Sequence, residues 1–195
     1  MAYRRNTHRS ITTNKGFRGQ YEILIAGMGG EGVVFMGELL GLGATLDGKY
    51  ASQRNTYGAS QRGEAICSEI IISNEPVQFP FIESPTHFIA LSKMGFDGYY
   101  HMLNNISDST LFIDNSYEYD LHGLDKRAKL IKIPARQHAI DNDISIYGNI
   151  IILGSFIKGT KIISQKSIEQ ALSKKTSKKM FNQNQKAIEI GYRLV

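Results

Sequence analysis

The chain has 195 residues, of which 42% are hydrophobic, a net charge of +5 and a single cysteine, Cys67. This length suits one domain with a buried core. No apolar stretch reaches the roughly 20 residues of a membrane span, and none follows the first methionine as a secretory signal would. We therefore expect a cytoplasmic protein that contacts no membrane. One thiol excludes a disulfide within the chain and cannot ligate an iron–sulfur cluster by itself.

The first 20 residues form a basic tail. Five of the 23 basic residues and none of the 18 acidic ones lie there, so the rest of the chain is balanced in charge. Because the tail has little apolar content, we expect residues 1–20 to be flexible and residues 21–195 to form the folded domain. The tail lacks the amphipathic stripe of a transit peptide and the interleaved aromatic residues of an RNA-binding arm, so we expect no nucleic-acid partner.

A glycine-rich turn follows the first apolar run, residues 23–26. Gly27, Gly29 and Gly32 fit the spacing G-x-G-x-x-G, and a helical pattern begins directly after them. Glycine lets the backbone turn sharply and approach a ligand, and the first amides of a helix are unpaired and partly positive. A strand, turn and helix of this kind suit a phosphate group. The alternative is a tight turn that binds nothing.

Two details argue against an ordinary dinucleotide site. NAD-binding folds place an acidic residue about 20 residues further along to hold the ribose hydroxyls, and residues 50–54 contain none. Glu31 also lies inside the glycine turn, where its carboxylate would repel a phosphate unless it points away. Glu31 could instead act as an acidic residue at the helix start, where the helix dipole favours negative charge.

Strands and helices then alternate through most of the chain. We expect the glycines at 37, 41 and 43 to let the first helix pack closely on a sheet, and Met180 to lie on the core face of the last helix. In chain order the pattern predicts a helix over 32–46, strands over 49–53, 65–73 and 87–91, a helix over 92–103, strands over 110–113 and 130–133, and helices over 149–157, 164–172 and 178–192. This alternation predicts an α/β fold, a single-domain three-layer α/β/α sandwich with a largely parallel sheet.

Four segments, in this order, resemble the gamma subunit of 2-oxoacid:ferredoxin oxidoreductases. The first is Gly27-Met-Gly-Gly-Glu-Gly32, where that family usually has G-x-G-G-Q-G. The second is Tyr57-Gly-Ala-Ser-Gln-Arg-Gly63 with the strand that follows it. The third and fourth are residues 149–154 and 184–191. Each motif is loose, but together they extend from residue 21 to residue 191 in the order of the family.

Three positions depart from the family pattern. Glu31 stands where glutamine is usual, Ser60 stands where glutamate is common, and Glu64 replaces the second glycine of an R-G-G sequence. An amide can donate a hydrogen bond to a phosphate, whereas a carboxylate cannot. Because the surrounding pattern holds, we interpret these changes as features of a subfamily variant.

The resemblance implies an enzyme of several subunits that oxidatively decarboxylates a 2-oxoacid to acyl-CoA and passes electrons to ferredoxin. The partners would be alpha and beta subunits, with a ferredoxin-like delta subunit as a further candidate, and thiamine diphosphate and iron–sulfur clusters would lie on those partners. This chain would contribute to coenzyme A binding and be inactive alone. Pyruvate, 2-oxoglutarate, branched-chain and aryl 2-oxoacids all remain open as substrates. The alternative is a nucleotide-binding or structural module without a catalytic role.

Two loops are the expected coenzyme A site. The pyrophosphate would lie on the amides between Gly29 and Val33, and Arg62 could bind a phosphate through its planar fork. A surface charge is the alternative role for Arg62, loop packing is the alternative for Tyr57, and Asp114 is either a site residue or a turn former. The residues expected to bind coenzyme A are Gly27, Gly29, Gly30, Glu31, Gly32, Val33, Tyr57, Gly58, Ser60, Gln61, Arg62 and Gly63, with Ser52 and Arg54 as weaker candidates and no metal ligands.

Overall fold

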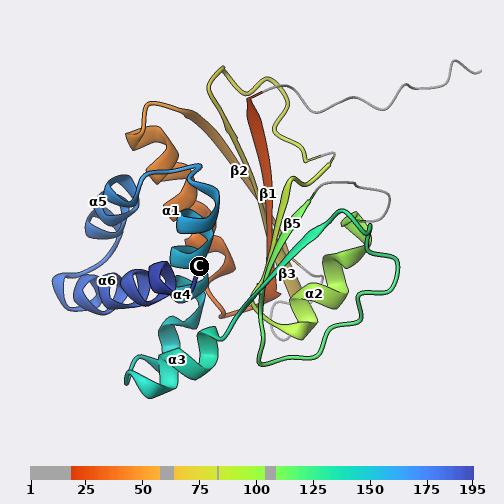
Figure 1. The fold of residues 1–195 in the computed structure, drawn as a ribbon. Helices are drawn as coiled ribbons and strands as arrows, with labels where there is room; N and C mark the ends of the chain where they lie inside the picture. Colours follow the sequence, from red (N-terminus) through yellow and green to blue (C-terminus); the bar gives the residue numbers. More distant parts are fainter. Residues whose placement is uncertain (1–18, 58–63, 83, 104–108) are drawn as a thin grey trace, which may run out of the picture.

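A computed structural model describes residues 19–57, 64–82, 84–103 and 109–195. Within these residues six strands form one sheet in the order β2-β3-β1-β4-β5-β6. Helices cover both faces of this sheet (Figure 1). The strands are β1 (Gln20–Met28), β2 (Tyr50–Thr56), β3 (Ala65–Ser73), β4 (His87–Ala90), β5 (Thr110–Asp114) and β6 (Lys129–Ile133).

The direction of the strands confirms the predicted α/β class with a largely parallel sheet. Strands β1, β4, β5 and β6 are paired in parallel. Strand β3 is antiparallel to both of its neighbours, β1 and β2. Strands β2 and β3 are therefore antiparallel neighbours, and β3 begins beside the end of β1, where Ala65 lies opposite Met28.

The two helical layers are unequal. Helix α2 covers one face, and the other helices cover the opposite face (Figure 1). The alternation of side chains in β1 supplies both cores, since Ile23 and Ile25 lie in the larger core and Leu24 and Ala26 lie in the smaller one beneath α2. The α-helices are α1 (Val33–Leu46), α2 (Lys93–Tyr99), α3 (Ala135–Asp141), α4 (Gly148–Thr160), α5 (Gln165–Lys175) and α6 (Lys178–Arg193).

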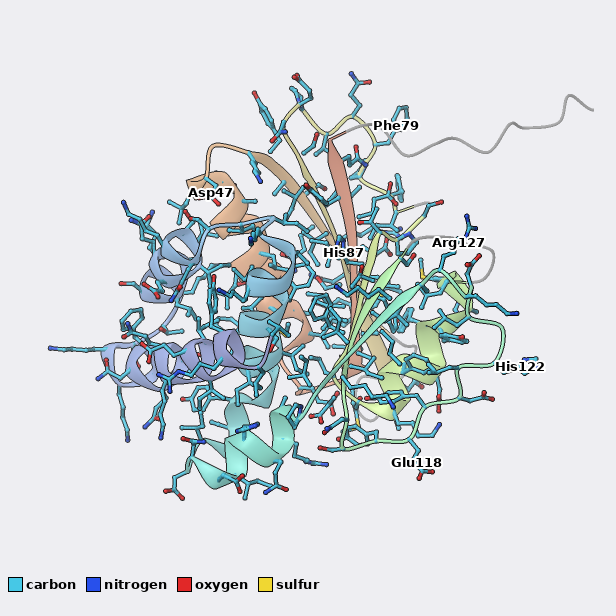
Figure 2. All side chains as sticks on the ribbon, in the orientation of Figure 1. Asp47, Phe79, His87, Glu118, His122 and Arg127 are labelled. Carbon is cyan, nitrogen blue, oxygen red and sulfur yellow. The ribbon has the colours of Figure 1, made fainter. Side chains whose placement is uncertain are left out.

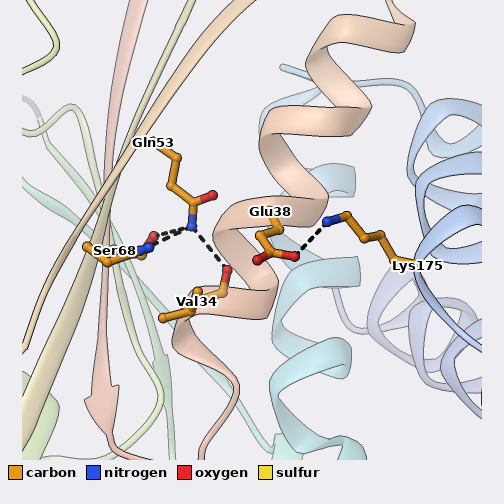
Figure 3. Close-up of polar contacts among 6 residues, drawn as sticks. Val34, Glu38, Gln53, Ser68 and Lys175 are labelled. Carbon is orange, nitrogen blue, oxygen red and sulfur yellow. Dashed lines mark hydrogen bonds and ion pairs between the residues drawn. The ribbon is translucent and has the colours of Figure 1, made fainter.

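Polar contacts fix α1 against the sheet and against α5. The side-chain amide of Gln53 donates to the carbonyl of Val34 at 3.1 Å and to the hydroxyl of Ser68 at 2.9 Å (Figure 3). On the outer side of α1, Lys175 pairs with Glu38 at 2.8 Å. Helix α1 is therefore held by hydrogen bonds on the sheet side and by an ion pair on the solvent side.

The three glycines of α1 have different roles. A Cβ at residue 37 would overlap the side chains of Ser68 and Gln53, which confirms close packing on the sheet at that position. A Cβ at residue 43 would instead meet Ile168 of α5 at 2.9 Å, and one at residue 41 would meet nothing within 4 Å. The prediction of sheet packing is therefore wrong for Gly41 and Gly43.

Several element boundaries differ from the sequence-based expectation. Helix α3 and the 3-10 turn η2 (Ser145–Tyr147) are not predicted, and α2 ends at Tyr99 before a second 3-10 turn, η1 (Tyr100–Leu103). Strand β2 continues to Thr56 because it pairs with β3 as far as Cys67. Met180 is 47% exposed, so its placement on the core face of α6 is wrong. No helix among the described residues is long and apolar enough to cross a membrane.

His87 makes the stability of the fold depend on pH. Its ring lies edge-on to Phe156 with ring centres 5.5 Å apart, and Figure 2 labels His87 beside the sheet. Burial lowers the pKa of His87 from 6.5 to about 4. Between these two pH values the unfolded chain binds a proton at His87 that the folded chain does not. Lowering the pH from 6.5 to 4 therefore lowers the free energy of unfolding, by up to about 3 kcal/mol at pH 4.

We expect urea unfolding at a series of pH values to show this loss in the wild type. The His87→Phe variant keeps an aromatic ring beside Phe156 and removes the titrating group. The free energy of unfolding of this variant should therefore fall less between pH 6.5 and pH 4. Parallel curves for the two proteins would contradict the assignment.

Candidate functional site

The most suitable place for a ligand is the end of the sheet where β1 and β4 finish side by side. These two strands are parallel neighbours. The chain leaves β1 toward α1 on one face and leaves β4 toward α2 on the other face (Figure 1). In open α/β sheets, ligands bind in the crevice at the carboxyl ends of strands where the connections diverge in this way. We call this edge the carboxyl edge.

The glycine turn predicted to bind phosphate lies at the carboxyl edge. Gly30 and Gly32 have φ angles of 98° and 81°, which side-chain-bearing residues rarely adopt. Gly27 has no room for a side chain, since a Cβ there would lie 2.7 Å from Val33 and 2.8 Å from the carboxylate of Glu31. The turn therefore depends on glycine for its backbone angles at residues 30 and 32 and for space at residue 27.

Helix α1 begins directly after this turn with free capacity to bind an anion. Its N-cap residue is Gly32, no side chain caps it, and its first turn contains no acidic residue. The first amides of a helix have no partner within the helix and carry partial positive charge. By contrast, the Ser92 hydroxyl caps the short helix α2 by accepting from the Gly95 amide. The N-terminus of α1 therefore has more free N–H groups to donate to an anion than the N-terminus of α2.

Glu31 folds back into the glycine turn. Its carboxylate accepts a hydrogen bond of 2.7 Å from the amide of Met28, and its own amide donates to the Met28 carbonyl at 3.0 Å. The prediction that Glu31 could act as an acidic residue in the first turn of the helix is wrong. The carboxylate accepts a hydrogen bond from one amide at the end of β1 and from none of the first amides of α1. It nevertheless adds a negative charge close to those amides.

Asn149, the first residue of the third family motif, also lies at this site. It lies at the start of α4, and a Cβ on Gly32 would overlap its side-chain amide nitrogen. Its side-chain oxygen accepts from the Ile150 amide at 2.9 Å. The amide nitrogen of Asn149 therefore adds a hydrogen-bond donor beside the first turn of α1.

The strand ends that flank the second predicted loop lie at the same edge of the sheet. Strand register places Ala65, the first residue of β3, opposite Met28, the last residue of β1. Tyr57 marks the other end of this loop and is 63% exposed. Both ends of the loop therefore lie near the glycine turn, but the predicted ligands Gly58, Ser60, Gln61, Arg62 and Gly63 lie outside the described residues.

The weaker candidate Arg54 has a structural role. Its guanidinium pairs with the buried carboxylate of Glu69 at 2.5 Å and lies 4.8 Å from the centre of the Phe81 ring. Cys67 lies on the same face of β3 as Glu69 and is buried, and burial raises the pKa of its thiol. Arg54 is therefore committed to the sheet and is not available to a ligand at the carboxyl edge.

Asp114 organises the part of the carboxyl edge beyond β5. Its two carboxylate oxygens accept from the amides of Ser116, at 2.9 Å, and Arg136, at 3.1 Å. Of the two roles left open for Asp114, these bonds support the turn former. The Arg136 guanidinium also donates to the hydroxyl of Tyr117 at 3.0 Å. These bonds join the segment after β5 to the start of α3. No cluster of His, Cys, Asp and Glu side chains within the described ranges could hold a metal ion.

Comparisons with known proteins show the family of this chain and agree with its fold. A family model described as pyruvate ferredoxin/flavodoxin oxidoreductase matches residues 22–194. The 2-oxoglutarate synthase subunit KorC of Methanocaldococcus jannaschii is 33% identical, over 88% of this chain and 91% of that protein. The protein of the same name from Methanothermobacter marburgensis is 30% identical, over 89% of this chain and 96% of that protein.

Two solved structures have the same fold. The gamma subunit of a keto/oxoacid ferredoxin oxidoreductase from Geobacter sulfurreducens is 27% identical with a TM-score of 0.78, over 90% of this chain and 96% of that chain. A 2-oxoglutarate:ferredoxin oxidoreductase from Magnetococcus marinus, with 2-oxoglutarate, coenzyme A and succinyl-CoA bound, is 19% identical with a TM-score of 0.81, over 91% of this chain and 31% of that chain. The chain therefore belongs to the pyruvate ferredoxin/flavodoxin oxidoreductase family, as its resemblance to the gamma subunits of 2-oxoacid:ferredoxin oxidoreductases predicts.

Proposed function

We propose that this chain is the gamma subunit of a cytoplasmic 2-oxoacid:ferredoxin oxidoreductase and that its carboxyl edge binds the phosphates of coenzyme A. The observation that carries the proposal is the uncapped start of α1 behind a glycine turn, with the Asn149 amide beside it. Its likeness in fold to a chain solved with coenzyme A present also supports the choice of ligand.

The residues of the site have separate roles in this proposal. The amides from Gly29 to Val33 donate to the pyrophosphate, and the side-chain amide of Asn149 donates from the side of α4. Arg62 approaches from the second loop and binds a phosphate through two of its N–H groups. Tyr57, Gly58, Ser60, Gln61 and Gly63 shape that loop. None of these groups forms or breaks a bond in the reaction.

Partner subunits supply the rest of the reaction. Alpha and beta subunits, with a ferredoxin-like delta subunit where one is present, carry the thiamine diphosphate and the iron–sulfur clusters. The single cysteine of this chain is consistent with clusters on the partners. We further propose 2-oxoglutarate as the substrate of the complex, because the relatives that are 30–33% identical over nearly their whole length are named 2-oxoglutarate synthase subunits.

The test is catalysis and ligand binding by the assembled complex. We expect it to reduce viologen with 2-oxoglutarate and coenzyme A, and to prefer 2-oxoglutarate to pyruvate, while the isolated chain shows no turnover. Calorimetry should show a strong preference for coenzyme A over NADP. Turnover by the isolated chain, or tighter binding of NADP, would contradict the proposed function.

One observation favours a second candidate. The Glu31 carboxylate inside the glycine turn weakens the case for a phosphate there. A module of the same family that only supports assembly would tolerate this charge. An assembled complex that turns over normally after both predicted loops are altered, for example in Gly32→Ala and Arg62→Ala, would support this structural role instead.

A further inference from the structure

Arg136 places an exposed positive charge at the carboxyl edge. It is the second residue of α3, which begins two residues after β6 ends, and it is open to solvent. The ion pairs found in the described part of the chain include those of Arg54 with Glu69 and of Arg127 with Asp125, but none that involves Arg136. A guanidinium is charged at any physiological pH and has five N–H donors. Arg136 can therefore bind an anion that arrives from solution.

Tyr117 holds the Arg136 guanidinium in place. The guanidinium donates a hydrogen bond of 3.0 Å to the Tyr117 hydroxyl, and its central carbon lies 5.6 Å from the centre of the Tyr117 ring. The two oxygens of the nearby Asp114 carboxylate accept from the backbone amides of Ser116 and Arg136, so these bonds fix the chain and leave the guanidinium to Tyr117. A side chain that is ordered before a ligand arrives loses less conformational freedom on binding.

Arg136 lies on the same face of the sheet as the start of α1. Helices α1, α4 and α3 all begin at the carboxyl edge of that face (Figure 1). A Cβ on Gly32 would overlap the Asn149 amide, and a Cβ on Gly148, the residue before Asn149, would lie 4.0 Å from the backbone nitrogen of Arg136. Residues 29–30 of the glycine turn are exposed, and Asn149 is partly exposed. The start of α4 therefore joins the glycine turn to Arg136 along a surface that a ligand can reach.

Coenzyme A carries phosphate at two places on one ribose, a pyrophosphate on the 5′ oxygen and a monoester on the 3′ oxygen. In the proposed function the amides of the glycine turn bind the pyrophosphate. The monoester carries nearly two negative charges at neutral pH, so the Glu31 carboxylate in the turn would repel it. A guanidinium matches a phosphate with two parallel N–H···O bonds. The 3′-phosphate therefore fits better beside Arg136 than beside Glu31.

We propose that Arg136 binds the 3′-phosphate of coenzyme A and makes the site selective for coenzyme A over its dephospho form. This assignment rests on the proposed function, since it requires the pyrophosphate at the glycine turn. Tyr117 is then a positioning residue, because it acts on the ligand only through the guanidinium that it holds.

The test is calorimetric titration of the assembled complex with coenzyme A and with dephospho-coenzyme A, which lacks only the 3′-phosphate. We expect the wild type to prefer coenzyme A. The Arg136→Gln variant should bind coenzyme A about 10–100-fold more weakly, with its affinity for dephospho-coenzyme A unchanged. Arg136→Lys keeps the charge but not the planar fork, so its loss should be smaller. Tyr117→Phe should weaken coenzyme A alone, by about 2–10-fold.

The matched control is the Arg127→Gln variant. Arg127 is also exposed, but it lies two residues before β6 begins, at the other end of that strand from Arg136, and it pairs with Asp125 at 3.1 Å. This variant should bind both ligands as the wild type does, and a selective loss of coenzyme A here would reveal a general charge effect and overturn the assignment.

Two further results would overturn the role of Arg136 while leaving coenzyme A binding in place. One is equal affinity of the wild type for the two ligands. The other is a change in Arg136→Gln that is absent, or the same for coenzyme A and for dephospho-coenzyme A. A wild-type complex that binds neither ligand would refute the proposed function itself.

Discussion

Replacing Gly191 with alanine is expected to lower the free energy of unfolding by about 3 kcal/mol, the upper end of the usual cost of overpacking. A Cβ at this position would overlap the carbonyl oxygen of Ile151 and lie 2.8 Å from the backbone nitrogen of Ser155. Both contacts are with the backbone of α4, which cannot rotate away as a side chain can. Helices α4 and α6 must therefore separate.

Separation of these helices removes further contacts. The Ser155 hydroxyl donates to the Gly191 carbonyl at 2.9 Å, and a Cβ at Gly154 would lie 2.5 Å from the Ile188 carbonyl, so both helices approach closely along this line. For a chain of this length we expect the thermal midpoint to fall by roughly 6–12 °C. Differential scanning calorimetry of the full-length chain measures this shift.

Gly41→Ala is the matched control for Gly191→Ala. Gly41 lies inside α1, and a Cβ there would meet nothing within 4 Å. Alanine favours a helix over glycine by about 0.5–1 kcal/mol, so this variant should be more stable than the wild type. Equal shifts in the two variants would show that close approach of α4 and α6 does not control stability.

The largest expected effect on binding comes from Gly32→Ala. Gly32 has a φ of 81°, where an alanine costs roughly 1–2 kcal/mol. Its Cβ would also overlap the Asn149 amide, which must move. Because the turn then shifts away from the start of α1, we expect the loss of one or two charge-assisted hydrogen bonds and about 10–100-fold weaker binding of coenzyme A by the assembled complex.

The Glu31→Gln variant is the control, because it should raise the affinity for coenzyme A where Gly32→Ala lowers it. The new side chain keeps an oxygen that can accept from the Met28 amide and removes the negative charge beside the proposed phosphates. Coenzyme A should therefore bind about fivefold more tightly. Unchanged affinity in both variants, measured by calorimetry on complexes of intact stoichiometry, would place the ligand elsewhere.

The repetitive parts of this fold are predictable from the sequence. Strand β3 is rich in isoleucine, helix α4 contains a long apolar run, and the glycine turn is defined by the spacing of Gly27, Gly29 and Gly32. Helix α3 is missed because it has only seven residues and begins after Pro134 without a side-chain cap. Asn55 and Thr56 belong to β2 because of their pairing with β3, a tertiary effect that local polarity conceals.

The site is predictable only where one short segment forms it. The glycine turn is such a segment, but its neighbours at the carboxyl edge come from distant parts of the chain. Asn149 reaches Gly32 because α4 begins beside α1. Asn149 belongs to no local pattern that indicates ligand binding, so the sequence alone does not single it out.

Hydrogen–deuterium exchange of the assembled complex, with and without saturating coenzyme A, tests the central claim most directly. The account predicts slower exchange of the backbone amides in peptides that cover residues 27–36, and in those that cover the loop at 57–64, when coenzyme A is bound. Full saturation with coenzyme A and unchanged exchange in both segments would contradict it.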